Sequence, residues 1–338
     1  LFSTKIPAYY EKLLAYVEQG EYEACVQYGR MILTNPGLET AMEEDPEAAS
    51  GIYFMIGNAW FEQESYLNAV EYYKEAVARN TENPEYYRDY AIALARMQQT
   101  EEAEKILDEA VSLGLDTDSV TLVQAELELA AGQWQPAAEK FMEAVRSTSS
   151  ETLRQRAYIL CARAYRLGEQ PDKEIAVLEE ARNTIASEKN GPVLTALGAA
   201  YMRRAQTENG DLKSDCEKAL ECYELVMKQG NRSAAVRLNI AALYQMLERY
   251  EEAENILLEL RDELPEDYRP YMRLAILYGT VENGQPEEER DYTKVQENYE
   301  KAVAYYQKAK NDGVSDAEMQ VLETMMQQII DGGWLYND

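Results

Sequence analysis

The sequence predicts an all-α protein built as a solenoid of antiparallel helix pairs, and two observations carry that prediction. Ala69, Ala103 and Ala137 are each 34 residues apart, and each is followed four residues later by a bulky apolar or aromatic residue. With 17 Gly and 10 Pro among 338 residues, the composition favours helices over strands, collagen or disorder. A fixed period of this length indicates that the chain grows by stacking one helical unit on the next.

The clearest unit runs from Tyr53 to about Asn80 and combines small with bulky residues on two successive helices. Its pattern residues are, in order, Tyr53, Ile56, Gly57, Trp60, Ala69, Tyr73 and Ala76. Small residues let two helix backbones approach closely, while large residues one turn away fill the space on either side. This pattern resembles that of the tetratricopeptide repeat family.

The resemblance extends along nearly the whole chain. Units two to eight span 46–314, with Glu174 in place of the alanine of the fifth unit. The first unit, 1–36, is degenerate because Cys25 stands in the alanine column. A linker containing Pro36, Gly37 and Pro46 is expected to separate it from the second unit.

Two further helix starts are expected from local signals. Ser214 and Glu217 form a capping-box pattern at the second helix of the sixth unit, and Ser315 with Glu318 repeats that pattern before a last helix over 315–331. This last helix is expected to cap the array. The resemblance implies one domain over 1–338, wound into a right-handed superhelix whose first helices line a concave groove.

Composition excludes several classes of function. The net charge of -29 argues against nucleic acid or an anionic membrane as the main partner, because both would be repelled. No histidine occurs, so the commonest general acid/base and the commonest zinc ligand are both missing. No catalytic constellation, cofactor motif or metal motif is found. The four cysteines show no CxxC spacing and are expected to be buried free thiols.

The charge is unevenly distributed along the chain. Residues 151–250 carry 15 Lys+Arg and 14 Asp+Glu, for a sum of +1, whereas the remainder carries 18 and 48, for a sum of -30. Turning each first helix by 100° per residue places one set of polar side chains opposite the core stripe, toward the expected groove. These candidate ligand-binding residues are Arg156, Arg163, Arg203, Asn239, Arg269 and Arg273.

Two interpretations of these residues stay open at this point. In the first, they form a basic groove for an acidic peptide or a free C-terminal carboxylate, which guanidinium groups bind bidentately. In the second, the arginines are solvated and paired with glutamates one turn away. Some members of the family bind chaperone tails through a clamp of Lys, Asn, Asn, Lys and Arg. Thr195 and Ala199 stand at two clamp places here, so chaperone-tail recognition is not predicted.

The predicted function is a protein- or peptide-binding scaffold that acts without catalysis. An alternative is a sensory or regulatory domain of a larger bacterial signalling or membrane-anchored protein, because the chain begins at Leu1 and not at Met. A third possibility, a helical toroid with a glycosidase-like carboxylate pair, is disfavoured by the 34-residue register. No apolar run long enough to span a membrane occurs, and the sequence does not distinguish the cytoplasm from the soluble part of an anchored protein.

Overall fold

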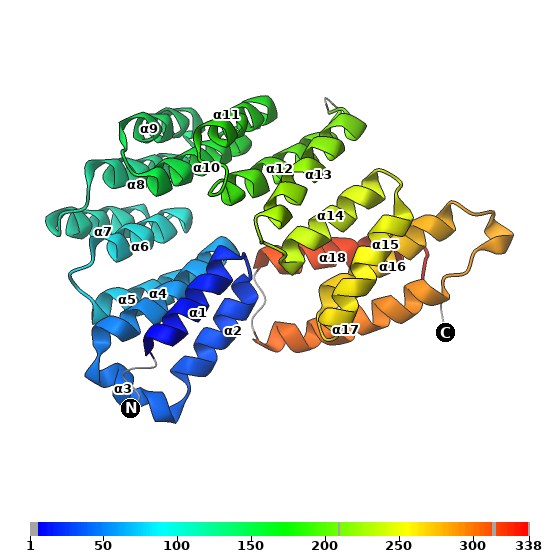
Figure 1. The fold of residues 1–338 in the computed structure, drawn as a ribbon, viewed down its shortest axis with the longest axis horizontal. Helices are drawn as coiled ribbons and strands as arrows, with labels where there is room; N and C mark the ends of the chain where they lie inside the picture. The colour runs from blue at the N-terminus through cyan, green and yellow to red at the C-terminus, as the bar shows by residue number, and fades with distance from the viewer. Residues whose placement is uncertain (1–5, 209, 313–315, 337–338) are drawn as a thin grey trace. The chain divides into compact units, whose positions relative to one another are not determined.

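A computed structural model describes residues 6–208, 210–312 and 316–336, and within these ranges the chain is helical without β-strands, as predicted (Figure 1). The first helices of successive pairs are α1 (Ile6–Glu18), α4 (Pro46–Glu62), α6 (Pro84–Arg96), α8 (Thr117–Ala130), α10 (Glu151–Leu167), α12 (Gly191–Ala205), α14 (Ala234–Met246) and α16 (Tyr268–Asn283). Their partners are α2 (Tyr22–Leu33), α5 (Tyr66–Arg79), α7 (Thr100–Ser112), α9 (Trp134–Ser147), α11 (Pro171–Thr184), α13 (Leu212–Lys228), α15 (Tyr250–Glu263) and α17 (Thr293–Asp312). The remaining elements are α3 (Pro36–Glu44), the short helix η1 (Glu287–Glu289) and α18 (Asp316–Asp331).

The alanine column lies at the closest approach of the paired helices. Ala69, Ala103 and Ala137 are fully buried. Gly57 has the same role on α4, because a Cβ there would lie 2.7 Å from the ring of Tyr73 on α5. Any larger side chain at these positions would force the two helices apart, which is why the 34-residue period is visible in the sequence.

The chain divides into two compact units, residues 1–200 and residues 201–338. In the first unit a continuous core runs from α1 to α8 and includes Trp60 and Tyr73. In the second unit, α14 and α15 pack around Leu257 and Leu274, while α16, α17 and α18 enclose Met272 and Trp334. The expectation of a single domain over 1–338 stays a prediction.

Two local expectations are corrected by the structure, and a third lies outside the residues that it describes. The segment expected as a linker contains helix α3, because Pro36 occupies its first turn, where proline is favoured, and Asn35 accepts a hydrogen bond from the Gly37 amide. The cap of α13 is Asp211, which accepts from the Ser214 amide, so this helix begins earlier than the capping box implied. Ser315 lies outside the described residues.

Helix α18 lies against the first helices of its unit. The Tyr268 hydroxyl at the start of α16 donates a hydrogen bond to Glu318 of α18, with an oxygen–oxygen distance of 3.1 Å. Just beyond its end, Trp334 packs against Gly279 near the end of α16. The two helices therefore run in the same direction, with α18 laid along α16.

Candidate functional site

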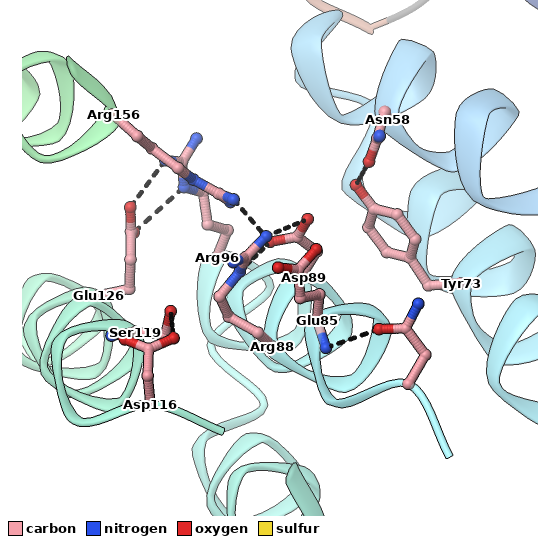
Figure 2. A network of polar contacts seen from close by, with 11 residues as sticks. Asn58, Tyr73, Glu85, Arg88, Asp89, Arg96, Asp116, Ser119, Glu126 and Arg156 are labelled. Carbon is pink, nitrogen blue, oxygen red and sulfur yellow. Dashed lines mark hydrogen bonds and ion pairs between the residues drawn. The ribbon is translucent and has the colours of Figure 1, made fainter. Parts of the chain in front are cut away.

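The polar side chains of α6, α8 and α10 meet in one network, which Figure 2 shows in part. Four arginines belong to it, and the surface they form is here called the arginine face: Arg88 and Arg96 from α6, and Arg156 and Arg163 from α10. Two carboxylates, Asp89 of α6 and Glu126 of α8, hold these arginines together.

Each carboxylate is shared between two guanidinium groups. Asp89 Oδ1 lies 2.9 Å from Arg88 Nε and 2.8 Å from Arg156 Nη1. Arg96 binds both oxygens of Glu126, with Nη2 2.7 Å from Oε1 and Nε 3.1 Å from Oε2, and Arg163 Nη1 also donates to Oε2, over a distance of 3.1 Å. The ion pair of Arg156 with Asp89 joins α10 to α6 across the intervening α8, so the network links three consecutive repeats.

Burial determines which groups a ligand can reach. The side chains of Glu126 and Asp89 are 1% and 8% exposed, whereas those of Arg163 and Arg156 are 19% and 29% exposed. Burial by itself would raise the pKa of both carboxyls, but the adjacent arginines reverse this and hold each pKa below its ordinary value. Both carboxylates are therefore charged at neutral pH, and the two α10 arginines are the accessible part of the face.

The ion pairs of the arginine face join more cations than anions. Four guanidinium groups face two carboxylates in the network, a sum of +2. Further charges act on these arginines: Glu62 acts on Arg96 and Arg156, Glu85 and Asp116 act on Arg88, and Arg166 acts on Arg163. Including these three carboxylates and one guanidinium group brings the sum from +2 to 0. Burial and then the neighbouring Arg96 lower the pKa of Arg163. The region is thus locally balanced in a chain of net charge -29.

A second polar site lies in residues 201–338, in a pocket of about 280 Å³ between α14, α16 and α18. We call it the C-terminal pocket. Its lining includes three pairs of positions that are 34 residues apart, one member on α14 and the other on α16: Ala235 with Arg269, Leu238 with Met272, and Asn239 with Arg273. Helix α18 closes it with Glu318, Val321, Leu322 and Met325.

The polar groups of the C-terminal pocket differ in their partners. Arg269 pairs with Asp267 at 2.6 Å, and Asn239 donates to the Tyr223 hydroxyl at 3.2 Å. Arg273 makes no hydrogen bond or ion pair with any described residue, although Glu318 acts on it electrostatically. Burial is the larger influence and lowers the pKa of Arg273 from its ordinary value. A half-buried guanidinium without a hydrogen-bonded anion has donors available for a ligand.

The six sequence-predicted residues thus fall into groups. Arg156 and Arg163 share the arginine face, while Asn239, Arg269 and Arg273 share the C-terminal pocket. Arg203 is exposed on α12 and acts electrostatically on Tyr223, the hydroxyl that also contacts Asn239. Their role in ligand binding stays a prediction.

Sequence reasoning missed two members of the arginine face, Arg88 and Arg96. The same 100° projection, applied to α6, would have placed Arg96 opposite both Tyr90 and Ala91, and Arg88 opposite Tyr90 at the edge of the polar face. The acidic partners of these arginines could not be predicted from a local pattern, because they are distant in the sequence. Arg156, for example, pairs with Asp89, which lies 67 positions earlier.

Other chemistry is sparse in the described part of the chain. Cys25, Cys161, Cys216 and Cys222 are buried free thiols, as expected. No group of three or more Cys, Asp or Glu suited to holding a metal occurs among the described residues. None of the described helices combines the length and the apolar character needed to cross a bilayer.

Comparison with known proteins supports the fold. The family profile of the tetratricopeptide repeat matches residues 61–127. A search of curated proteins found no match. Among solved structures, the human IFIT1 dimer with m7Gppp-AAAA is 17% identical, with a TM-score of 0.54 over 94% of this chain and 71% of that chain. The human IFIT1 dimer with PPP-AAAA is 15% identical, with a TM-score of 0.50 over 97% of this chain and 86% of that chain. At these identities the likeness concerns the fold alone.

Stacked helix pairs, a small residue at the closest approach of each pair and polar faces on the first helices define a repeat protein of the protein-interaction class. Residues 61–127 match the tetratricopeptide repeat family, and the described helix pairs on either side of this segment form the same kind of solenoid, as the alanine and glycine columns predicted.

Proposed function

We propose that this protein is a peptide-binding scaffold without catalytic activity, and that its arginine face binds an acidic segment of a partner protein. The observation that carries the proposal is that four guanidinium groups share only two carboxylates as ion-pair partners, while the side chains of Arg156 and Arg163 stay partly exposed. Arg156 and Arg163 each use a single nitrogen in the network. Their other N–H groups are donors for an incoming carboxylate, and guanidinium–carboxylate hydrogen bonds are among the strong ones.

The spacing of these two arginines specifies the ligand further. They are seven residues apart on α10, which is two helical turns and about 10 Å along the axis. In a polyproline II segment, which has three residues per turn and a rise of about 3.1 Å per residue, residues three apart lie on the same side and about 9 Å apart. The ligand we expect is therefore an extended segment in the polyproline II conformation, with two acidic residues at positions i and i+3.

A peptide fits the charge of the protein better than a nucleic acid does. The IFIT1 structures contain PPP-AAAA and m7Gppp-AAAA, but that observation belongs to IFIT1. A nucleic-acid strand carries a negative charge on every phosphate. A chain of net charge -29 repels such a polyanion beyond the local face. A peptide with two acidic residues can pair with Arg156 and Arg163, and its few negative charges are repelled less strongly by the rest of the chain.

The test is a binding titration with fluorescent peptides, followed by anisotropy at low salt. A peptide with two Glu residues at i and i+3 is compared with one in which both are Gln, and with a single-stranded RNA oligonucleotide. We expect the double variant Arg156→Gln with Arg163→Gln to bind the acidic peptide at least about tenfold more weakly than the unmodified chain, because charge-assisted hydrogen bonds contribute about 1.5–3 kcal/mol each.

The matched control is Arg249→Gln, which removes a single positive charge from an exposed ion pair with Glu252. It should leave the affinity within about twofold of the unmodified chain. Equal binding of the Glu and Gln peptides, or binding of the RNA in preference to the peptide, would refute the proposal.

A further inference from the structure

Helix α18 lies over the face of α14 and α16 on which the sequence predicts ligand-contacting residues. Six of the pocket-lining residues of α14 and α16 form three pairs of positions 34 residues apart. Three of these six residues are ligand contacts that the sequence predicts: Asn239, Arg269 and Arg273. It is α18 that closes this surface, with Glu318 and Leu322.

The contacts of α18 are few and specific. Leu322 and Ile329 are 2% and 0% exposed, and Trp334, just beyond the helix, is 6% exposed. Met319, Met325 and Met326 pack against the same core but are only partly buried, and Val321 and Ile330 are 49% and 50% exposed. Docking therefore rests mainly on the three fully buried apolar anchors, together with the partly buried methionines and the hydrogen bond from Tyr268 to Glu318.

The fit under α18 is incomplete. A pocket of about 280 Å³, partly open to solvent, remains between α14, α16 and α18, and it is lined by Arg273, whose guanidinium has no hydrogen-bonded anion among the described residues. The α18 carboxylate that faces Arg273, Glu318, is engaged by the Tyr268 hydroxyl. A helix with the same anchors and a better-placed acidic group would fill this surface more completely.

We propose that α18 is a built-in substitute ligand, and that the face of α14 and α16 beneath it binds an amphipathic helix of a partner protein in its place. The expected partner helix has an acidic residue four positions before its first apolar anchor, and a second anchor seven positions later, as Glu318, Leu322 and Ile329 do in α18. This inference rests on the proposed function, because it treats the protein as a peptide-binding scaffold, and it adds competition by the chain's own last helix.

The first experiment compares two adjacent isoleucines of α18 in the full chain. Ile329→Glu places a charge at a buried anchor, whereas Ile330→Glu places the same charge at an exposed position on the same helix. The probe is a fluorescein-labelled peptide with the sequence of residues 316–336, measured by anisotropy. We expect the Ile329→Glu chain to bind it at least about tenfold more tightly than the Ile330→Glu chain, because the internal competitor is weakened. Equal affinities would show that α18 is a fixed structural cap.

The second experiment needs no variant and covers the case in which Ile329→Glu fails to fold. Peptide 316–336 made with ¹³C- and ¹⁵N-labelled residues, so that its fragments differ in mass from those of α18, is added in excess to the unmodified chain, and amide hydrogen exchange is followed by mass spectrometry. Exchange of the α18 amides should accelerate while that of α14 and α16 does not. Unchanged exchange in α18 at saturating peptide would overturn the proposal. The outcome is independent of the arginine face: if acidic peptides bind there without releasing α18, the proposed function stands and this inference fails.

Discussion

One residue in most of the turns between paired helices adopts a left-handed backbone conformation. Gly20 and Gly132 do so at φ values of 73° and 76°. At the equivalent place in other repeats the residue is not glycine: Glu64, Gln98, Glu169 and Glu248 have φ between 54° and 60°. Side chains other than glycine adopt this conformation at a cost of about 1–2 kcal/mol, so these four turns hold residues that are not optimal for stability.

Replacing Glu64 by Gly should therefore stabilise the protein. The turn conformation becomes free of strain, and the greater freedom of glycine in the unfolded chain offsets part of the gain. We expect the free energy of unfolding to rise by about 0.5 kcal/mol in urea titrations. Glu71→Gly, at an exposed position inside α5, is the control and should lower it by about 1 kcal/mol. A loss of stability in Glu64→Gly would contradict this account of the turn.

At the scale of helices, close approach within a pair is set by single small residues. A methyl group added at Gly57 would lie 2.7 Å from the Tyr73 ring, which is fully buried and donates from its hydroxyl to Asn58 (Figure 2). Gly57→Ala should lower the free energy of unfolding by about 1–3 kcal/mol, since neither the ring nor the helix can move without disturbing the core. Equilibrium unfolding measures the change, and a neutral or stabilised variant would show that α4 and α5 adjust freely.

The ion pairs of Glu126 hold α8 to both of its neighbours. Glu126→Gln leaves Arg96 and Arg163 without their shared anion, and we expect a loss of about 3 kcal/mol in the free energy of unfolding at neutral pH. Glu128→Gln on the same helix is the matched control, because its partner Lys140 is half-exposed, and it should cost less than about 1 kcal/mol. Similar losses in the two variants would mean that the network contributes no more than a surface pair.

The same network predicts how stability depends on pH. The pKa values of Asp89 and Glu126 are lowered in the folded protein, so the folded state binds these protons less readily than the unfolded chain does. Their contribution is complete above the unfolded pKa, about 4, and is lost as pH falls through the folded values. Thermal unfolding between about pH 5 and pH 2 should show this loss, and the slope should be smaller in Glu126→Gln. Identical slopes would contradict the prediction.

For the whole molecule, the excess of negative charge produces electrostatic self-repulsion. A net charge of -29 destabilises the folded state, and salt screens it, since the Debye length falls from about 30 Å at 0.01 M to about 3 Å at 1 M. The melting temperature should therefore rise with sodium chloride over this range. A triple variant, Glu287→Gln with Glu288→Gln and Glu289→Gln, changes the net charge from -29 to -26 and should show a smaller rise. A melting temperature that falls with salt would indicate that internal ion pairs outweigh the repulsion.

How far the candidate sites could be predicted depends on whether a pattern is local. Projection along single helices placed Asn239, Arg269 and Arg273 on one face, and the structure brings all three to one pocket, because successive first helices repeat at 34 residues. The same projection could not show that Asp89 of α6 binds Arg156 of α10. That contact depends on how much three repeats curve, and no residue spacing reports curvature.

The sequence by itself determined the helix pairs, their order and their closest contacts, because each repeat packs mainly on its neighbours and small residues must recur where backbones meet. Only the tertiary structure decided which carboxylates pair with the arginines and which helix face α18 covers. The arginines of α10 meet carboxylates from α6 and α8, and α18 lies over the predicted ligand face of α14 and α16. Both results depend on distances between helices that are far apart in the chain, which hydrophobic periodicity does not encode.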